Sequence, residues 1–158
     1  MELSKAATNM HILCLDNDRE WLNILSRELK AVGIRDVQTA TDPKKALGLI
    51  LHTEVNLVVT HHDLKFVKFL RQNKASPSQE VPVIMITSRV SPEDIFAIRD
   101  AGVNEIAVKP CSISQLAQRI EAVATNPRRF VWSENFTGPN RRRKDSPFGG
   151  PERREVDD

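Results

Sequence analysis

The sequence has few cysteines and no long apolar run. Two cysteines in 158 residues are too few for a disulfide framework, tyrosine is absent, and aromatic residues make up 5% of the chain. No stretch approaches the roughly 18 consecutive apolar residues of a membrane span. The N-terminal residues MELSKAATN lack the apolar core of a signal peptide. We therefore expect a cytoplasmic protein with no membrane insertion.

Charge is distributed unevenly along the chain. Residues 1–125 hold 15 Lys/Arg and 15 Asp/Glu, whereas residues 126–144 hold six basic residues and one acidic residue, Glu134. The overall composition, 40% hydrophobic and 28% charged, is that of a globular protein. The sequence thus predicts a neutral folded body over residues 10–125 and a flexible Arg-rich tail over residues 126–158.

Short apolar runs alternate with segments of helical periodicity in the body. The runs that predict strands lie at residues 11–15, 36–40, 55–60, 81–87 and 104–108. Helix N-cap residues precede apolar residues at helical spacing at Asp18, Asp42, Ser91 and Ser112. Five strand–helix units in about 115 residues predict an α/β domain with a parallel sheet and helices on both faces.

Polar residues follow four of the predicted strands. In a parallel α/β sheet, ligands and reactions are found beyond the carboxyl ends of the strands. The residues at these ends are Asp16-Asn17-Asp18, Thr60-His61, Thr87-Ser88 and Lys109-Pro110. We expect them to meet at one edge of the sheet.

The order of these residues resembles the receiver domain of bacterial response regulators, the CheY-like family, over residues 10 to about 125. The resemblance implies a flavodoxin-like, five-stranded, doubly wound parallel sheet with strand order 2-1-3-4-5. It also implies a mechanism in which an aspartate after the third strand is phosphorylated. In that mechanism an acidic pair after the first strand helps to hold Mg²⁺, and a Thr and a Lys bind the phosphoryl group.

The match to the family pattern is partial. Asp16, Thr87 and Lys109 fit their positions, but Asn17 stands at the second acidic position. His61, 45 residues after Asp16, stands where the phosphorylated aspartate is expected. Imidazole is a poor ligand for Mg²⁺, and an amide carries no charge. We therefore expect a degenerate phosphorylation pocket without Mg²⁺ or any catalytic residue, and signalling without the usual aspartyl phosphate.

Other roles for this strand end stay open. In one alternative, a shifted register makes Asp63 the phosphate acceptor. In a second, His61 is phosphorylated on nitrogen. In a third, His61 and His62 bind a transition metal. The histidines are also explained as a polar pair with no chemistry. In each case an ion pair between Asp16 and Lys109 can form without a metal.

The tail contains a repeated motif. Phe136–Arg142 (FTGPNRR) and Phe148–Arg154 (FGGPERR) are offset by twelve residues and share five of seven positions in the pattern F-x-G-P-x-R-R. Gly-Pro suits a turn that presents the following arginines. The tail has no hydrophobic period and is expected to be disordered alone. Its aromatic residues, however, indicate a docking surface or a ligand.

Paired arginines suggest what the tail binds. Guanidinium groups pair bidentately with phosphate and with the O6/N7 edge of guanine. A doubled motif suits cyclic di-GMP, which has two guanines and two phosphates. The tail is similar to that of the Cle proteins, CheY-like cyclic di-GMP effectors. By that resemblance, the nucleotide is contacted by Arg141, Arg142, Arg153 and Arg154, and positive charge is added by Arg143 and Lys144.

Two functions follow from these features. The first is a non-catalytic signalling adaptor that binds cyclic di-GMP, a protein partner, or both. The alternative is a phosphorelay response regulator that is phosphorylated at an unorthodox residue. A protein-docking tail, a nucleic-acid tail and a tail without a ligand also stay open. Sequence-specific DNA binding is not expected, because no helix-turn-helix pattern follows the body.

Overall fold

A computed structural model of the chain describes residues 2–133 and 136–141. Its main sheet has five parallel strands in the order β2-β1-β3-β4-β5. The strands are β1 (His11–Leu15), β2 (Asp36–Ala40), β3 (Leu57–Thr60), β4 (Val83–Thr87) and β5 (Glu105–Val108). Every residue of β3 and β4 is buried, as expected for central parallel strands that are covered on both faces. The predicted fold class and strand order are confirmed.

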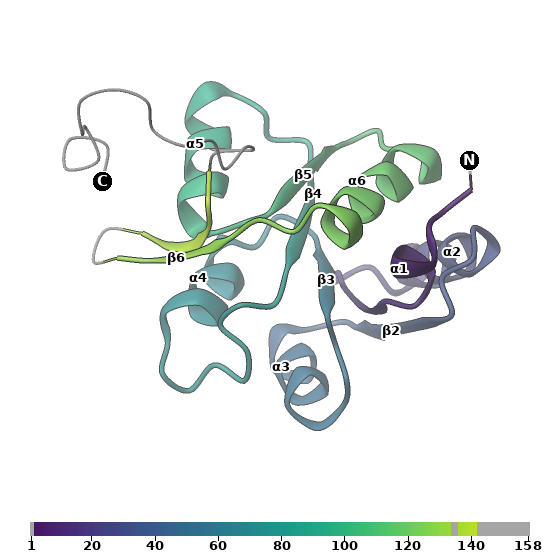
Figure 1. Cartoon of the computed structure of the whole chain (residues 1–158), viewed down its shortest axis with the longest axis horizontal. Helices are drawn as coiled ribbons and strands as arrows, with labels where there is room; N and C mark the ends of the chain where they lie inside the picture. Colours follow the sequence, from purple (N-terminus) through teal and green to yellow (C-terminus); the bar gives the residue numbers. More distant parts are fainter. Residues whose placement is uncertain (1, 134–135, 142–158) are drawn as a thin grey trace.

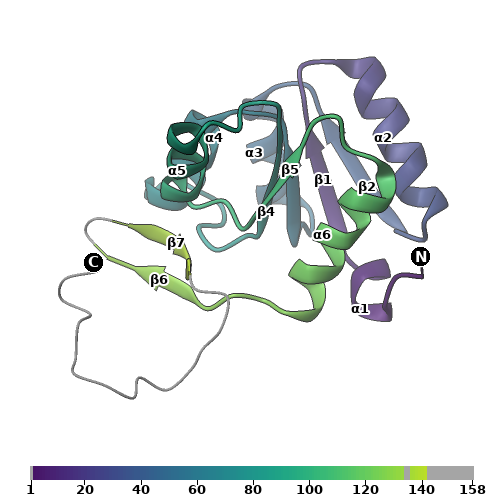
Figure 2. The ribbon, with the colours of Figure 1, turned by 90° about the horizontal axis from the view of Figure 1, so that it is seen from above.

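Helices cover both faces of this sheet (Figures 1 and 2). They are α1 (Lys5–Thr8), α2 (Arg19–Ala31), α3 (Pro43–His52), α4 (Leu64–Gln72), α5 (Pro92–Ala101) and α6 (Ile113–Thr125). Apolar residues of α1, α2 and α6 form one core with one face of the strands, and those of α3, α4 and α5 form a second core with the other face. The alternation of side chains along each strand produces this division.

The four predicted N-caps are all formed. Asp18, Asp42, Ser91 and Ser112 each accept a hydrogen bond from the backbone N–H three residues later. The sequence reading missed α1, whose four residues carry little periodic signal. This short helix is tied to α6 because the Ser4 backbone and hydroxyl both donate to the Glu121 carboxylate, at 2.9 and 2.7 Å.

Part of the predicted flexible tail is folded. β6 (Phe130–Trp132) and β7 (Thr137–Pro139) pair as an antiparallel hairpin, and β7 contacts α4. Figure 2 shows the hairpin beside α4 and α5. The sequence predicts disorder for the tail alone and does not reveal this hairpin, because its strands lack a hydrophobic period of their own. Contacts with the folded body hold the two strands in place. Residues 142–158 lie outside the described part of the chain.

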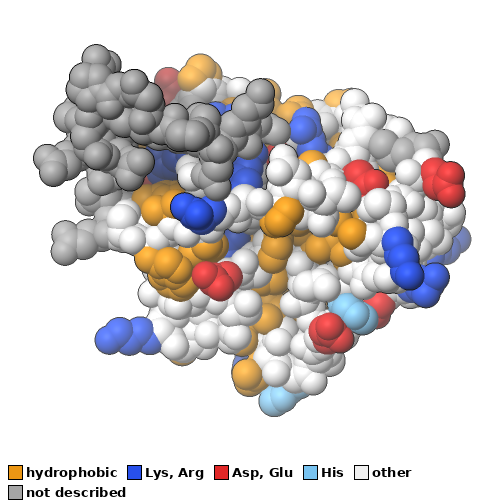
Figure 3. All heavy atoms as spheres, viewed as in Figure 1, with side chains coloured by type: hydrophobic (Ala, Val, Ile, Leu, Met, Phe, Trp, Pro, Cys, Tyr) orange, Lys and Arg blue, Asp and Glu red, His pale blue; other side chains and the backbone are white. Residues whose placement is uncertain are grey.

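The described surface mixes side-chain types. On the face drawn in Figure 3, hydrophobic side chains gather where β6 lies, while acidic and basic side chains are scattered over the rest. No helix among residues 2–133 and 136–141 is long and apolar enough to cross a lipid bilayer.

Candidate functional site at the carboxyl end of the sheet

The strand ends bring the predicted pocket residues to one edge. Leu15 of β1 lies opposite Thr60 of β3, and the next residue, His61, donates its backbone N–H to the Leu15 carbonyl at 3.0 Å. On the other side, the Lys109 N–H donates to the Thr87 carbonyl at 2.9 Å. His61 therefore directly follows β3, the strand that pairs with β1, just as Asp16 directly follows β1. This is the position that the spacing predicts.

Asp16 is buried and structurally engaged. One carboxylate oxygen accepts the N–H of Asp18 at 2.9 Å, which shapes the turn that leads into α2. Asn17 and Lys109 are both exposed. The ion pair that the sequence allows between Asp16 and Lys109 is not among the salt bridges of the described residues. The contact found for Asp16 is therefore with the backbone of the following turn.

The two histidines have different partners. The Nδ1 atom of His62 lies 2.9 Å from the Thr87 hydroxyl, which also accepts the Arg89 N–H at 3.0 Å. His61 Nε2 lies 3.9 Å from an oxygen of Asp63. No group of three His, Cys, Asp or Glu side chains suited to a metal ion occurs within the described ranges. His62 thus contacts the Thr87 hydroxyl, the group that binds the phosphoryl group in the mechanism implied by the family resemblance. The sequence alone did not predict this contact.

Asp63 has a structural task. It is the N-cap of α4, and its Oδ1 atom accepts the Phe66 N–H at 3.0 Å. The sequence signal for this cap is an aspartate three residues before the apolar positions Phe66, Val67 and Leu70. Because strand β3 ends at Thr60, the register does not shift to place Asp63 at the strand end.

Burial sets the protonation of His62. Desolvation lowers the pKa of its imidazole below 6.5, and the nearby positive charge of Arg89 lowers it further. The ring is therefore mainly neutral at pH 7. In the tautomer with its proton on Nε2, the Nδ1 atom accepts a hydrogen bond from the Thr87 hydroxyl.

Of the tail arginines predicted to bind a ligand, only Arg141 lies in the described part of the chain. The Arg141 guanidinium lies 2.8 Å from the Asp100 carboxylate and 4.2 Å from the centroid of the Phe136 ring. Phe96, exposed on α5, has its ring centroid 5.9 Å from the same group. Sequence reasoning missed both α5 residues because they are far from the tail in the chain. The other predicted ligand residues, Arg142, Arg143, Arg153 and Arg154, lie outside the described part.

Comparisons with known proteins agree with this architecture. The family described as the response regulator receiver domain matches residues 12–121. The chemotaxis protein CheY-3 of Vibrio cholerae is 28% identical over 119 residues, which cover 73% of this chain and 92% of that protein. The transcriptional regulatory protein CpxR of Escherichia coli is 32% identical over 129 residues. That match covers 78% of this chain and 51% of CpxR, so the chain spans about half the length of that relative.

Solved structures show the same fold. The Vibrio cholerae chemotaxis protein CheY4 superposes with a TM-score of 0.65 at 23% identity, covering 73% of this chain and 98% of that one. The receiver domain of the Francisella response regulator 1452 gives a TM-score of 0.65 at 25% identity, covering 73% and 97%. With the family match over residues 12–121, these findings show that the chain belongs to the response regulator receiver domain family.

Proposed function

We propose that this receiver domain is a non-catalytic signalling adaptor that works without an aspartyl phosphate. The observation that carries the proposal is the histidine at the end of β3: His61 follows Thr60, which lies opposite Leu15. An imidazole at this position removes the carboxylate that accepts the phosphoryl group in the family mechanism. Phosphorylation of this domain is then no longer the input signal.

The surrounding residues support the same proposal. Mg²⁺ prefers several carboxylate and water oxygens, and here Asp16 is joined by the neutral Asn17 and the imidazole of His61. The Thr87 hydroxyl is hydrogen-bonded to His62 and to the Arg89 N–H. These contacts compete with a phosphoryl group for the hydroxyl. The domain therefore keeps the architecture of a receiver, while Asn17 and His61 change its chemistry and the Thr87 hydroxyl is already hydrogen-bonded.

Acetyl phosphate tests this part of the proposal. We expect no phosphoryl adduct on the wild-type chain in the presence of Mg²⁺, measured by intact mass spectrometry. The His61→Asp variant is the matched comparison, since it restores the missing carboxylate in the same pocket. A stable adduct on the wild type would contradict the proposal, and its loss in Asp63→Ala or His61→Gln would identify the unorthodox acceptor of a phosphorelay regulator.

We further propose that the signal enters through the Arg-rich tail as cyclic di-GMP. Two Gly-Pro-x-Arg-Arg segments match the two guanines and two phosphates of that nucleotide. Arg141 is already paired with Asp100, so the ligand must replace that ion pair or rely on the arginines that follow. Once bound, the nucleotide would change which surface the tail offers to a protein partner.

Isothermal titration calorimetry with cyclic di-GMP tests the ligand. We expect binding heat from the wild type and its loss in the double variant Arg142→Ala with Arg153→Ala. Arg129→Ala is the matched control, because Arg129 is an exposed arginine just before β6 and outside both motifs. No heat from the wild type would exclude cyclic di-GMP and leave a protein-docking tail as the input.

A further inference from the structure

The first copy of the tail motif has a defined place on the receiver body. Among its repeated positions, Gly138 and Pro139 are buried in β7, and Phe136 and Arg141 flank that strand. The Asn140 N–H closes the hairpin by donating to the Arg129 carbonyl at 2.6 Å. Of the five repeated positions, the four that the structure describes are thus buried in β7 or lie beside it.

Two glycines make the closest contact. A Cβ atom added to Gly138 would lie 2.8 Å from the Cα atom of Gly102. One added to Gly102 would lie 2.8 Å from the Arg71 side chain and 3.0 Å from the Thr137 carbonyl oxygen. Gly102 is the C-cap of α5 and has a φ of 104°, a conformation that favours glycine. The backbones of β7 and the α5 terminus thus touch directly, and any larger residue in the motif's Gly position would separate them.

Two side chains of α5 complete the contact. Asp100 accepts a hydrogen bond from the Arg141 guanidinium at 2.8 Å, and the ring centroids of Phe136 and Phe96 lie 4.2 and 5.9 Å from this group. We call Phe96, Asp100 and Gly102 the α5 cradle. Each cradle residue contacts a repeated motif residue: Phe96 and Asp100 contact Arg141, and Gly102 contacts Gly138.

The second copy of the motif carries the same contact residues. Phe148, Gly150, Pro151 and Arg153 stand at the spacing of Phe136, Gly138, Pro139 and Arg141. β6 pairs with β7 through backbone atoms, so the pairing does not distinguish one copy from the other. The described part of the chain holds one such cradle for two matching segments.

We propose that the α5 cradle is a recognition site for the F-x-G-P-x-R-R motif, and that Phe148–Arg154 is its second occupant. The two copies exchange in the cradle, and the copy that is displaced presents its arginines to other partners. The first copy prevails in the resting chain because it continues directly from β6 and has the higher local concentration. The inference does not depend on which ligand the arginines bind.

A labelled peptide of residues 146–155 tests the proposal by fluorescence anisotropy with the full-length chain. We expect weak binding to the wild type, because the cradle is occupied. Gly138→Ala should raise the peptide affinity by about tenfold by removing the first copy, and the double variant Gly138→Ala with Gly150→Ala should raise it further. A peptide carrying Gly150→Ala should not bind any of these chains.

Changes in the cradle provide the reciprocal test. In the double-variant background, Gly102→Ala should abolish peptide binding, with circular dichroism as the check that the body is folded. Asp100→Ala, an exposed change that leaves the glycine contact intact, should weaken binding by about twofold to fivefold. The proposal is overturned if the double variant Gly138→Ala with Gly150→Ala binds the peptide no better than the wild type. It is also overturned if Gly102→Ala and Asp100→Ala leave the peptide affinity unchanged.

Discussion

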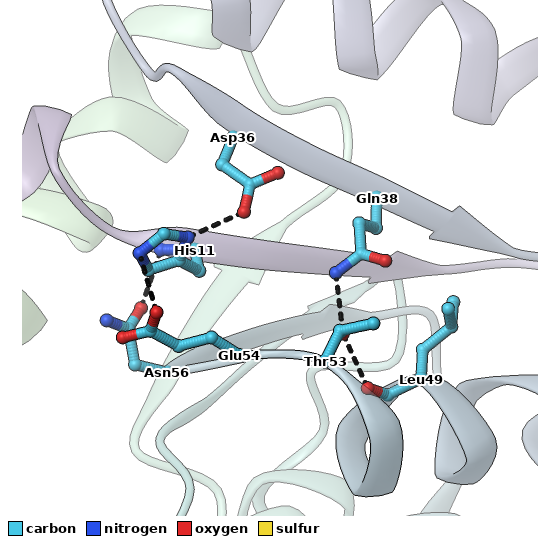
Figure 4. A network of polar contacts seen from close by, with 7 residues as sticks. All are labelled: His11, Asp36, Gln38, Leu49, Thr53, Glu54 and Asn56. Carbon is cyan, nitrogen blue, oxygen red and sulfur yellow. Dashed lines mark hydrogen bonds and ion pairs between the residues drawn. The ribbon is translucent and has the colours of Figure 1, made fainter.

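At the scale of single residues, the histidines differ because their surroundings differ. His62 is partly buried beside Arg89, which favours the neutral ring. His11, at the start of β1, has carboxylates on both ring nitrogens: Asp36 at 2.6 Å and Glu54 at 3.4 Å (Figure 4). The hydrogen bond to Asp36 is the main reason that the pKa of His11 is raised above 6.5; desolvation opposes it, and the charges of Glu54 and Asp36 add to it.

NMR titration of the imidazole protons should separate these two residues. We expect a midpoint below 6.5 for His62 and above 6.5 for His11, with His62→Gln and His11→Gln variants to assign the signals. Asp36→Asn should move the His11 midpoint back towards 6.5 and leave His62 unchanged. Equal midpoints for the two rings would contradict the assignment of their environments.

The two shifts act on stability in opposite directions. The folded-state pKa of His62 lies below the unfolded value near 6.5, so its contribution is complete above pH 6.5 and is lost as pH falls towards the folded pKa. The folded-state pKa of His11 lies above 6.5, so its contribution is complete below pH 6.5 and is lost as pH rises through the folded pKa. As the pH is lowered through the range around 6.5, the free energy of unfolding relative to the wild type should therefore rise for His62→Gln and fall for His11→Gln.

At the scale of secondary-structure elements, Arg71 of α4 connects three segments that are separated in the sequence: α4 itself, the loop before β4, and the loop between α5 and β5. Its side chain is fully buried and donates to the carbonyls of Gly102, Gln79 and Val81 at 3.0, 2.9 and 2.7 Å, and to the Asn104 side chain at 3.0 Å. The guanidinium also lies 5.3 Å from the Phe130 ring centroid in β6. Burial lowers the pKa of Arg71 to about 10, which still leaves it charged at neutral pH.

Arg71→Met should destabilise the domain by about 2–4 kcal/mol, because it leaves buried carbonyl groups without donors. Urea denaturation followed by circular dichroism measures the change. Lys68→Met is the matched control, since Lys68 is an exposed cation on the same helix and should change stability by less than about 0.5 kcal/mol. Equal stability of the two variants would show that the Arg71 contacts contribute nothing net.

The elements also show what a sequence reveals and what it conceals. Caps such as Asp18 and Ser112 were predictable, because a cap is a contact between residues three positions apart. The site edge was predictable because parallel strands end together, as Leu15 and Thr60 do. The bonds from His62 to Thr87 and from Arg141 to Asp100 span 25 and 41 residues, and no local pattern encodes them.

At the scale of the whole molecule, the hairpin and the sheet should differ in how readily they open. The hairpin has two three-residue strands at the side of the body, whereas β3 and β4 are central and fully buried. Segments with few buried contacts open locally at lower free energy than the core. The tail can therefore leave the cradle while the receiver body stays folded, which the proposed exchange requires.

Native-state hydrogen exchange measures this difference directly. The Asn140 amide, bonded to the Arg129 carbonyl, should exchange much faster than the Val58 amide, bonded to the Pro82 carbonyl. Gly138→Ala should accelerate exchange at Asn140 by about tenfold and leave Val58 unchanged, because the added methyl group meets the Gly102 backbone. Gly48→Ala is the control: its new Cβ meets no atom within 4 Å in α3, so Asn140 should not respond. If Gly138→Ala accelerates amide exchange equally at Asn140 and Val58, the hairpin and the sheet open together. One motif copy could then not replace the other while the receiver body stays folded.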